Sequence, residues 1–423
     1  MIGTDYLIEW LATETPAHPP VGTWRPREGA RPSAYNQGRR AVHACPDCLV
    51  NIRQTNRRAE RAAIVALACL AAGCAAGRPV MVTSPGLGQA APCRTPAHAD
   101  GSRSSHRITW TAPSAPADRL RLDAWCDTTG PPVIEPRPAA TARGRPSELV
   151  VVSWNVHGGA ADLASLIRRL EAGALTDGVP ASRFVLLLQE APRAGGYVPH
   201  SVRGVRVPRA IRGRGNTRRI DVLEFARARG LAVYYVPSMR NGSSDESNED
   251  RGNAILSTEP LSAFEAIELP FVRQRRVAIA ATVSGDDVSG TPWSVRVVSA
   301  HLDNLASRRR LWIAAAGTRV RQARGLVDAL GRHRALVIGG DFNTWFGFAD
   351  PAYRTIAGAV PDAAAGDRRP TFGPLLRLDH LFARLPPGWT VRARRLDERL
   401  GSDHHALVAR VRMAGALARA GAR

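Results

Sequence analysis

Residues 335–343 read A-L-V-I-G-G-D-F-N, an apolar run of strand length that ends in a carboxylate and an amide. Similar polar groups adjoin other apolar runs along the chain. In order, they are W-N (154–155), Q-E (189–190), R-G-N-A-I-L-S (251–257), S-A-H-L-D (299–303), L-D-H (378–380) and S-D-H (402–404). We therefore expect these polar side chains at strand ends, where a sheet protein gathers residues that are distant in sequence.

The residue types in these motifs suit phosphoryl transfer at a metal. Glu190, Asp403 and the amide of Asn155 are the hard oxygen ligands that Mg²⁺ takes. His301 and His404 are candidates for stabilising charge and supplying a proton. No zinc-finger pattern, H-E-x-x-H, phosphate-binding G-x-x-x-x-G-K-[ST] or G-x-S-x-G elbow occurs in the sequence.

The ordered motif set resembles the endonuclease/exonuclease/phosphatase superfamily over residues 146–413. The resemblance implies that Asn155 and Glu190 lie close to a Mg²⁺ or Mn²⁺ ion, with Asp403 on the metal side. It implies further roles for other residues. Asp341 would orient or deprotonate water, and Asn343 would contact phosphate. His404 would be a phosphate-binding histidine held by Asp379, and His301 a candidate general acid. Arg276 or its neighbour Arg275 would be a phosphate-binding arginine.

A carboxylate such as Asp379 beside His404 fixes which ring nitrogen carries the proton and raises the imidazole pKa. His157, His333 and His405 are expected to be core or surface residues.

The chain has 423 residues and a net charge of +21, and all 58 of its basic residues are arginine. This bias reflects codon usage in a GC-rich genome, so charge alone does not indicate nucleic-acid binding. Seven arginines at positions 203–219 are interpreted either as a contact for a polyanion or as a solvated loop, and both alternatives stay open. Residues 241–250 are acidic and polar, which predicts a second mobile loop.

Residues 56–74 have the pattern of an export signal: arginines, then an apolar stretch, then L-A-A-G-C. The ending resembles a bacterial lipobox, which would make Cys74 a lipidated first residue. An ordinary secretory signal or an uncleaved anchor stays open, and residues 1–55 are expected to be a disordered extension or the product of an early annotated start. We therefore expect a location in the cell envelope or outside the cell.

Residues 75–145 are rich in Pro, Ala, Ser and Gly, which predicts a tether with short strands at 108–112 and 119–126. Cys93 and Cys126 are expected to pair in an exported protein. The catalytic domain is expected at 146–413, followed by a tail at 414–423.

Alternating strand-like and helical stretches in this domain predict two packed sheets with helices outside, a four-layer α/β/β/α sandwich, as the resemblance also implies. The strand-like stretches are 149–154, 184–189, 232–236, 254–257, 277–283, 294–300, 335–339, 378–382, 391–395 and 407–411. Helical spacing occurs at 163–170, 220–229 and 310–330.

The expected function is metal-dependent hydrolysis of phosphate esters, and phosphodiesters such as DNA or RNA are the favoured substrates. The enzyme is expected to be a monomer that is tethered to the membrane. A sphingomyelinase-like hydrolase of phospholipid head groups and a small-molecule phosphatase are alternatives. A catalytically silent envelope binding protein is the alternative of another class.

Overall fold

The structure is a computed structural model. It describes residues 78–83, 92–98, 100–136, 148–200, 204–211, 219–287, 290–304 and 312–413. The chain divides into two units, Met1–Ala72 and Gly73–Arg423, and all described residues belong to the second. The predicted export signal, Cys74, the preceding extension and the tail therefore lie outside the described residues.

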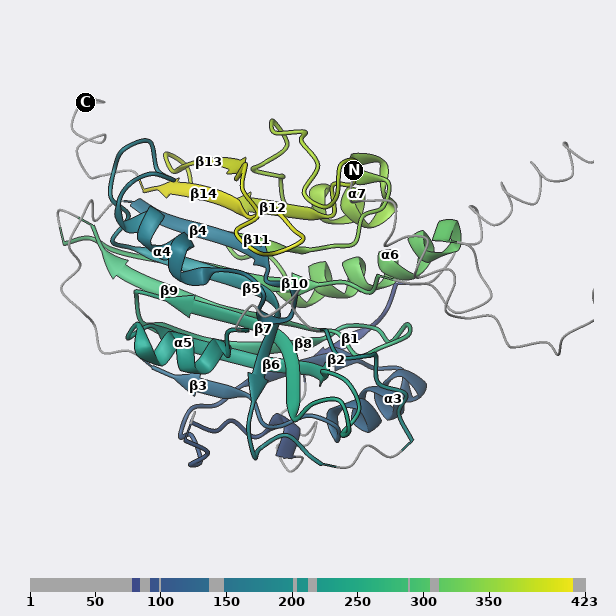
Figure 1. Ribbon diagram of the computed structural model, residues 1–423. Coiled ribbons are helices and arrows are strands. Elements are labelled where there is room, and N and C mark those ends of the chain that lie inside the picture. Colours follow the sequence, from purple (N-terminus) through teal and green to yellow (C-terminus); the bar gives the residue numbers. More distant parts are fainter. Residues whose placement is uncertain are drawn as a thin grey trace, which may run out of the picture. The chain divides into compact units, whose positions relative to one another are not determined.

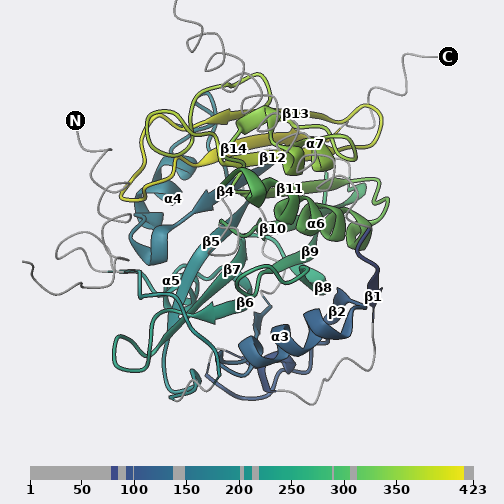
Figure 2. The same ribbon diagram turned by 90° about the vertical axis from the view of Figure 1, so that its right-hand side faces the viewer.

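The described residues build two sheets of seven strands each (Figures 1 and 2). The first sheet has the order β1 (Met81–Thr83), β2 (Thr109–Pro113), β8 (Leu261–Glu268), β9 (Val277–Asp286), β10 (Pro292–His301), β11 (Leu336–Asp341) and β12 (Asp379–Arg384). The second has the order β13 (Thr390–Arg395), β14 (Leu407–Arg412), β4 (Glu148–Asn155), β5 (Phe184–Ala194), β7 (Glu249–Ser257), β6 (Ala232–Arg240) and β3 (Val133–Glu135).

Alternate residues of the central strands pack between the two sheets. Val151 and Val185 from the second sheet and Ile279 and Val297 from the first are fully buried in one shared cluster. Because side chains alternate across a strand, the residues between them face outward and need a second cover. Helices supply it, and the predicted four-layer sandwich is confirmed.

Helices α4 (Leu163–Glu171) and α5 (Val222–Ala228) pack on the outer face of the second sheet, where Leu166 meets Val152 and Leu186 in a buried cluster. Helices α6 (Trp312–Leu330) and α7 (Pro351–Ala357) cover the outer face of the first sheet. Among the described residues, no helix has both the length and the apolar character needed to cross a membrane.

The expected elements of the catalytic region are all present, with ends that differ from the predicted ones by at most five residues, at β5 and β7. Strand β8 and helix α7 were not expected. Strand β8 pairs with β9 in antiparallel register with a bulge between Ser262 and Glu265, so its alternation is interrupted.

Residues 75–145 were expected to be a tether with short strands, and the strand expected at 108–112 is present as β2. Strands β1 and β2 extend the first sheet beyond β8, and β3 extends the second beyond β6. These short strands cover sheet edges that would otherwise be open. Cys93 and Cys126 form a disulfide in this segment, with Cα atoms 5.6 Å apart.

Residues 119–126, expected as a strand, belong to helix α3 (Pro116–Cys126). Pro116 stands in the first helical turn, where its missing N–H has no helical partner to lose. Leu122, Trp125 and Cys126 are buried on one face, whereas Leu120 is 72% exposed. The alternation of arginine and leucine at 119–122 has the period of a strand, which is why a strand was predicted for this helical segment.

Residues 241–248 form the predicted loop between β6 and β7, but the segment 241–250 contains buried polar groups that were not expected. Asp250 is fully buried, forms an ion pair with Arg193 and accepts a hydrogen bond from Tyr235 Oη at 2.8 Å. Asn241 is fully buried too, and its Nδ2 donates to Glu249 Oε2 at 2.7 Å. Ion pairs and hydrogen bonds, in place of apolar burial, order this segment.

Candidate active site

Strand register brings the predicted polar residues to one end of the sandwich. Strands β10 and β11 are parallel and place His301 opposite Asp341, and antiparallel β12 places Asp379 opposite Asp341 on the other side. Asn155 ends β4 in the facing sheet, and its Nδ2 donates to Asp341 Oδ2 at 3.1 Å. Four motifs therefore meet around one carboxylate.

Two glycines in the G-G-D-F-N stretch allow this approach. A Cβ on Gly339 would lie 2.6 Å from the Ser153 Cβ of the opposite sheet. A Cβ on Gly340 would lie 2.1 Å from the Ala300 carbonyl oxygen of the neighbouring strand. Larger residues here would push apart the strands whose ends hold the site.

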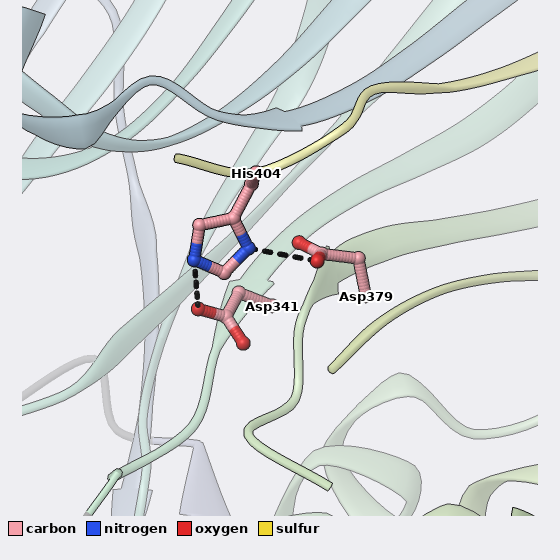
Figure 3. A group of neighbouring side chains, drawn as sticks. All are labelled: Asp341, Asp379 and His404. Carbon is pink, nitrogen blue, oxygen red and sulfur yellow. Dashed lines mark hydrogen bonds and ion pairs between the residues drawn. The ribbon is translucent and has the colours of Figure 1, made fainter. Parts of the chain in front are cut away.

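His404 lies between two carboxylates (Figure 3). Its Nδ1 is 2.8 Å from Asp379 Oδ2, and its Nε2 is 3.8 Å from Asp341 Oδ2. Burial would lower the pKa of His404, but the charges of Asp379 and Asp341 and the hydrogen bond to Asp379 outweigh it and raise the pKa to about 10. His404 is therefore an imidazolium at neutral pH, with an Nε2–H directed toward Asp341.

Asp341 has the opposite perturbation. Its side chain is buried, and burial raises its pKa to about 7, while the His404 charge and the hydrogen bonds from Asn343 N and Asn155 Nδ2 work against the rise. A carboxylate with this pKa accepts a proton from water near neutral pH more readily than an ordinary aspartate. Asp341 is thus suited to act as a general base.

Asn343 supports this carboxylate through an unusual backbone. Its φ of 50° lies in the left-handed region, which turns its N–H toward Asp341 Oδ1 at 2.9 Å. Its Nδ2 donates to the Leu302 carbonyl at 3.0 Å. The amide nitrogen is therefore held by the protein, and Oδ1 is the remaining polar atom of the side chain.

His301 differs from His404 because its neighbours are positive. Arg276 Nη1 donates to His301 Nδ1 at 3.0 Å, which leaves the ring proton on Nε2, 3.5 Å from Asp341 Oδ2. Burial and the charges of Arg276 and His404 hold the pKa of His301 well below its usual value. His301 is therefore a neutral hydrogen-bond donor at neutral pH.

The two candidate phosphate-binding arginines separate clearly. Arg276 contacts His301, whereas Arg275 is fully buried and donates to Glu268 Oε1 at 2.8 Å and to the Pro237 carbonyl at 3.0 Å. Arg94 shares the same glutamate, with an N–O distance of 3.1 Å. Arg275 thus has a structural position and Arg276 a position in the site.

The carboxylates expected near a metal lie beside this group. Asp403 Oδ2 is 3.0 Å from His157 Nδ1, while Asp403 Oδ1 is buried, has no hydrogen-bond partner and lies 3.9 Å from His404 Nε2. Glu190 is partly exposed and has a φ of 53° at the bulge of β5, so its side chain leaves the regular alternation of the strand. Burial would raise the pKa of Asp403, but His157 and the His404 charge lower it, so the group is a carboxylate.

These observations fit a divalent cation. Asp403 offers a buried oxygen that accepts no hydrogen bond, and Glu190 offers a second carboxylate whose charge acts on His157. Asn155 fits less directly, because its Oδ1 accepts from His157 N at 3.0 Å and its Nδ2 donates to Asp341. The closely spaced set Asp341, Asp379 and His404 is better explained as a proton-holding group, since His404 is protonated there.

Other motif residues join the elements that carry the site. Gln189 Nε2 donates to Ser299 Oγ at 3.0 Å, and Ser299 Oγ donates to the Leu188 carbonyl at 3.0 Å, which ties the two sheets together. Ser402 Oγ donates to the Asn155 carbonyl at 2.7 Å and accepts from His404 N at 3.0 Å. These serines and the glutamine are positioning residues.

Two site residues were missed from the sequence. His157 was expected in the core or on the surface, yet it contacts Asp403 and has a φ of 48°. Arg251, in the R-G-N-A-I-L-S motif, is buried, and the charges of Glu190 and Arg276 act on it. The position of His157, two residues after Asn155, was the feature of the sequence that could have indicated its place in the site.

Arg219 is the arginine of the arginine-rich stretch with defined contacts among the described residues. Arg219 donates to the Gly158 carbonyl at 2.7 Å and forms an ion pair with Glu249 at 2.8 Å. Arg206 and Arg209 are exposed. The other four arginines of this stretch lie outside the described residues.

A model of the endonuclease/exonuclease/phosphatase family matches residues 152–404. No curated protein matches the chain by sequence. Among solved structures, a 3′–5′ exonuclease from Neisseria meningitidis is 18% identical, with 62% of this chain and 98% of that chain covered and a TM-score of 0.39. A mannosyl-6-phosphatase from Bacteroides thetaiotaomicron is 14% identical, with 62% and 99% covered and a TM-score of 0.38. A variant of beta toxin from Staphylococcus aureus with bound magnesium ions is 13% identical, with 62% and 98% covered and a TM-score of 0.36. At these values the three likenesses do not bear on the substrate.

Proposed function

The chain belongs to the endonuclease/exonuclease/phosphatase family of phosphoric ester hydrolases, and on this premise we propose that it is a divalent-metal-dependent phosphodiesterase acting on nucleic acid. The observation that carries the proposal is the grouping of a basic carboxylate, Asp341, with a protonated histidine, His404, that Asp379 holds in place. A base and an acid within 3.8 Å of one another are the pair that ester hydrolysis requires.

In the proposed reaction, Asp341 takes a proton from a water molecule as its oxygen attacks phosphorus. The imidazolium of His404 donates through Nε2 to the phosphoryl group and offsets its developing charge. Neutral His301, whose ring proton is on Nε2, donates a second hydrogen bond. His404 is also the group that carries a transferable proton for the leaving oxygen, a role that the sequence suggested for His301.

Glu190 and Asp403 would hold the cation, and we propose Mg²⁺ or Mn²⁺ because the donors are hard oxygens. When bound, such an ion polarises a phosphoryl oxygen and stabilises negative charge on it. The contribution of His157 is to hold Asp403 by its Oδ2 so that Oδ1 stays available.

A phosphodiester is favoured because neutral His301 adds a donor without adding charge, which suits a singly charged phosphate. DNA or RNA is the proposed source, and a phospholipid head group or a small phosphate ester is the alternative. Of the aromatic residues after G-D-F-N, Phe346 is 38% exposed, but Phe348 packs against Tyr353 and His380, so the membrane-entering surface of a sphingomyelinase-like enzyme has little support here.

We propose that the enzyme is exported, tethered to a membrane through lipidated Cys74, and monomeric. The lipobox-like ending of residues 56–74 supports this location. Labelling cells with a radioactive fatty acid tests it, because Cys74→Ser should abolish labelling of the protein.

The function is tested with plasmid DNA, sphingomyelin and bis-p-nitrophenyl phosphate, each with Mg²⁺, Mn²⁺ or a chelator. Asp341→Asn is the test variant and Asp362→Asn is its matched control, because Asp362 is a buried carboxylate paired with His380 and not with His404. We expect chelator-sensitive cleavage of DNA that only Asp341→Asn abolishes. Cleavage of sphingomyelin alone would overturn the nuclease, and no turnover by folded protein would favour a binding protein.

A further inference from the structure

Two buried arginines beside the site have unsatisfied guanidinium groups. Arg251 is 8% exposed, its Nη1 is buried without a hydrogen-bond partner, and its Nη2 contacts only the Met239 sulfur, at 3.8 Å, among the described hydrogen bonds. Arg276 is 5% exposed, donates to His301 through Nη1, and has a buried Nε without a partner. Neither forms an ion pair with a carboxylate within the part of the chain that the structure describes.

Three other buried arginines of the described residues are paired with carboxylates. Arg193 pairs with Asp250, Arg275 with Glu268 and Arg319 with Asp350. This is the ordinary arrangement, because a buried charge without a partner is strongly destabilising. Burial lowers the pKa of both Arg251 and Arg276, the negative charge of Glu190 opposes this for both, and the charge of Arg276 lowers the pKa of Arg251 further. Two like charges are therefore held close together at a cost in stability.

The two arginines come from opposite sheets and converge beside the reacting groups. Arg251 lies on β7 opposite Pro192 of β5, two residues beyond Glu190, and the Glu190 charge acts on both arginines. On the same strand as Arg251, Asn253 donates through Nδ2 to the carbonyl of Val277, the residue after Arg276, at 2.6 Å. This hydrogen bond joins β7 to β9 two residues after Arg251 and one residue after Arg276.

We infer that Arg251 and Arg276 form a two-guanidinium clamp for a phosphoryl group of the substrate, which makes Arg251 a binding residue. The inference rests on the proposed function and extends it. Guanidinium groups bind phosphate oxygens through paired N–H donors, and the unsatisfied donors of the two arginines are of this kind. A phosphoryl anion would neutralise the pair without altering the carboxylates that face His404.

The clamp is tested by measuring how tightly metal-free protein binds inorganic phosphate and dimethyl phosphate. Calorimetry gives the affinities, and thermal unfolding gives the stability with and without phosphate. Arg251→Met replaces the guanidinium with an apolar side chain beside Met239. Arg240→Met is the matched control, because Arg240 is also a buried arginine without a carboxylate, but the carbonyls of Pro199 and Ser247 accept its hydrogen bonds. Arg251→Lys keeps the charge and loses the planar fork.

We expect Arg251→Met to bind both phosphates at least ~10-fold more weakly, and to unfold at the same or a higher temperature than the parent when phosphate is absent. Arg251→Lys should keep part of the affinity. Arg240→Met should unfold at a lower temperature and bind phosphate normally. Unchanged phosphate affinity in Arg251→Met, or a loss of stability like that of Arg240→Met, would overturn the clamp.

These measurements need no turnover, so they separate the clamp from the proposed function. Arg251-dependent phosphate binding by a protein that hydrolyses none of the three test esters supports the clamp and overturns the hydrolase. Turnover with phosphate affinity that is independent of Arg251 supports the hydrolase and overturns the clamp.

Discussion

Asp379 is predicted to keep His404 protonated, and Asp379→Asn isolates this effect. In the parent structure, His404 Nδ1 lies 2.8 Å from Asp379 Oδ2. The substitution removes the negative charge but retains a side-chain oxygen that can accept this hydrogen bond. Opposite charges about 4 Å apart interact by ~4 kcal/mol at an effective dielectric constant of about 20. This energy equals about three pKa units. Burial continues to favour the neutral ring, so we expect the pKa of His404 to fall from about 10 by ~2–3 units.

The pKa is measured by NMR titration of the histidine ring nitrogens in metal-free protein. Because the imidazolium is the active form, activity should decline as pH rises through this pKa, and the alkaline limb of the pH–rate profile should move down by the same ~2–3 units. Asp362→Asn, which alters the carboxylate beside His380, should leave His404 unchanged. A His404 pKa in Asp379→Asn within about 0.5 unit of the parent value would refute the electrostatic argument.

Three further predictions follow from the same structure. The folded-state pKa of Asp341, about 7, lies above its ordinary value of 3.8, so the free energy of unfolding should fall as pH rises through this interval. Asp341→Asn should remove this fall and be ~1–2 kcal/mol more stable than the parent at pH 8. Urea unfolding at pH 4 and pH 8 measures both effects. An identical pH dependence in the variant would contradict it. Replacing Cys93 and Cys126, 33 residues apart, with serine should lower the free energy of unfolding by about 3–4 kcal/mol in urea titrations, and an equal midpoint and slope would contradict it. His157→Gln should weaken Mn²⁺ binding ~10–100-fold in calorimetry because Asp403 loses the ring that orients it, whereas unchanged affinity would limit His157 to a packing role.

The layers and most strands of the fold could be predicted because the pattern is repetitive. Central strands such as β4 and β11 are long apolar runs that end at a motif, and their buried character is visible residue by residue. The edges of the sheets could not be predicted in the same way. Strand β3 and strand β1 have three residues each and depend on pairing with β6 and β2, which local sequence does not encode.

The site could be predicted at the level of residue types and not of protonation. Asp341, His301 and His404 were placed together from their motifs, and the register confirms that the first two are neighbours. Their charges depend on distances between strands: the two histidines have opposite pKa shifts because one contacts Arg276 and the other Asp379. The choice between Arg275 and Arg276 likewise depended on which face of the chain meets Glu268.

Backbone strain explains why His157 in particular escaped notice. Six residues other than glycine have positive φ in the described chain, and three of them, His157, Glu190 and Asn343, belong to the site. Such a conformation is uncommon for residues other than glycine, although Asn and His adopt it more readily than glutamate does. At Asn343 it turns a backbone N–H toward Asp341, and at Glu190 it accompanies the bulge that redirects a carboxylate. The positions that local sequence preference predicts least well are therefore those where the two sheets force side chains into the geometry of the site.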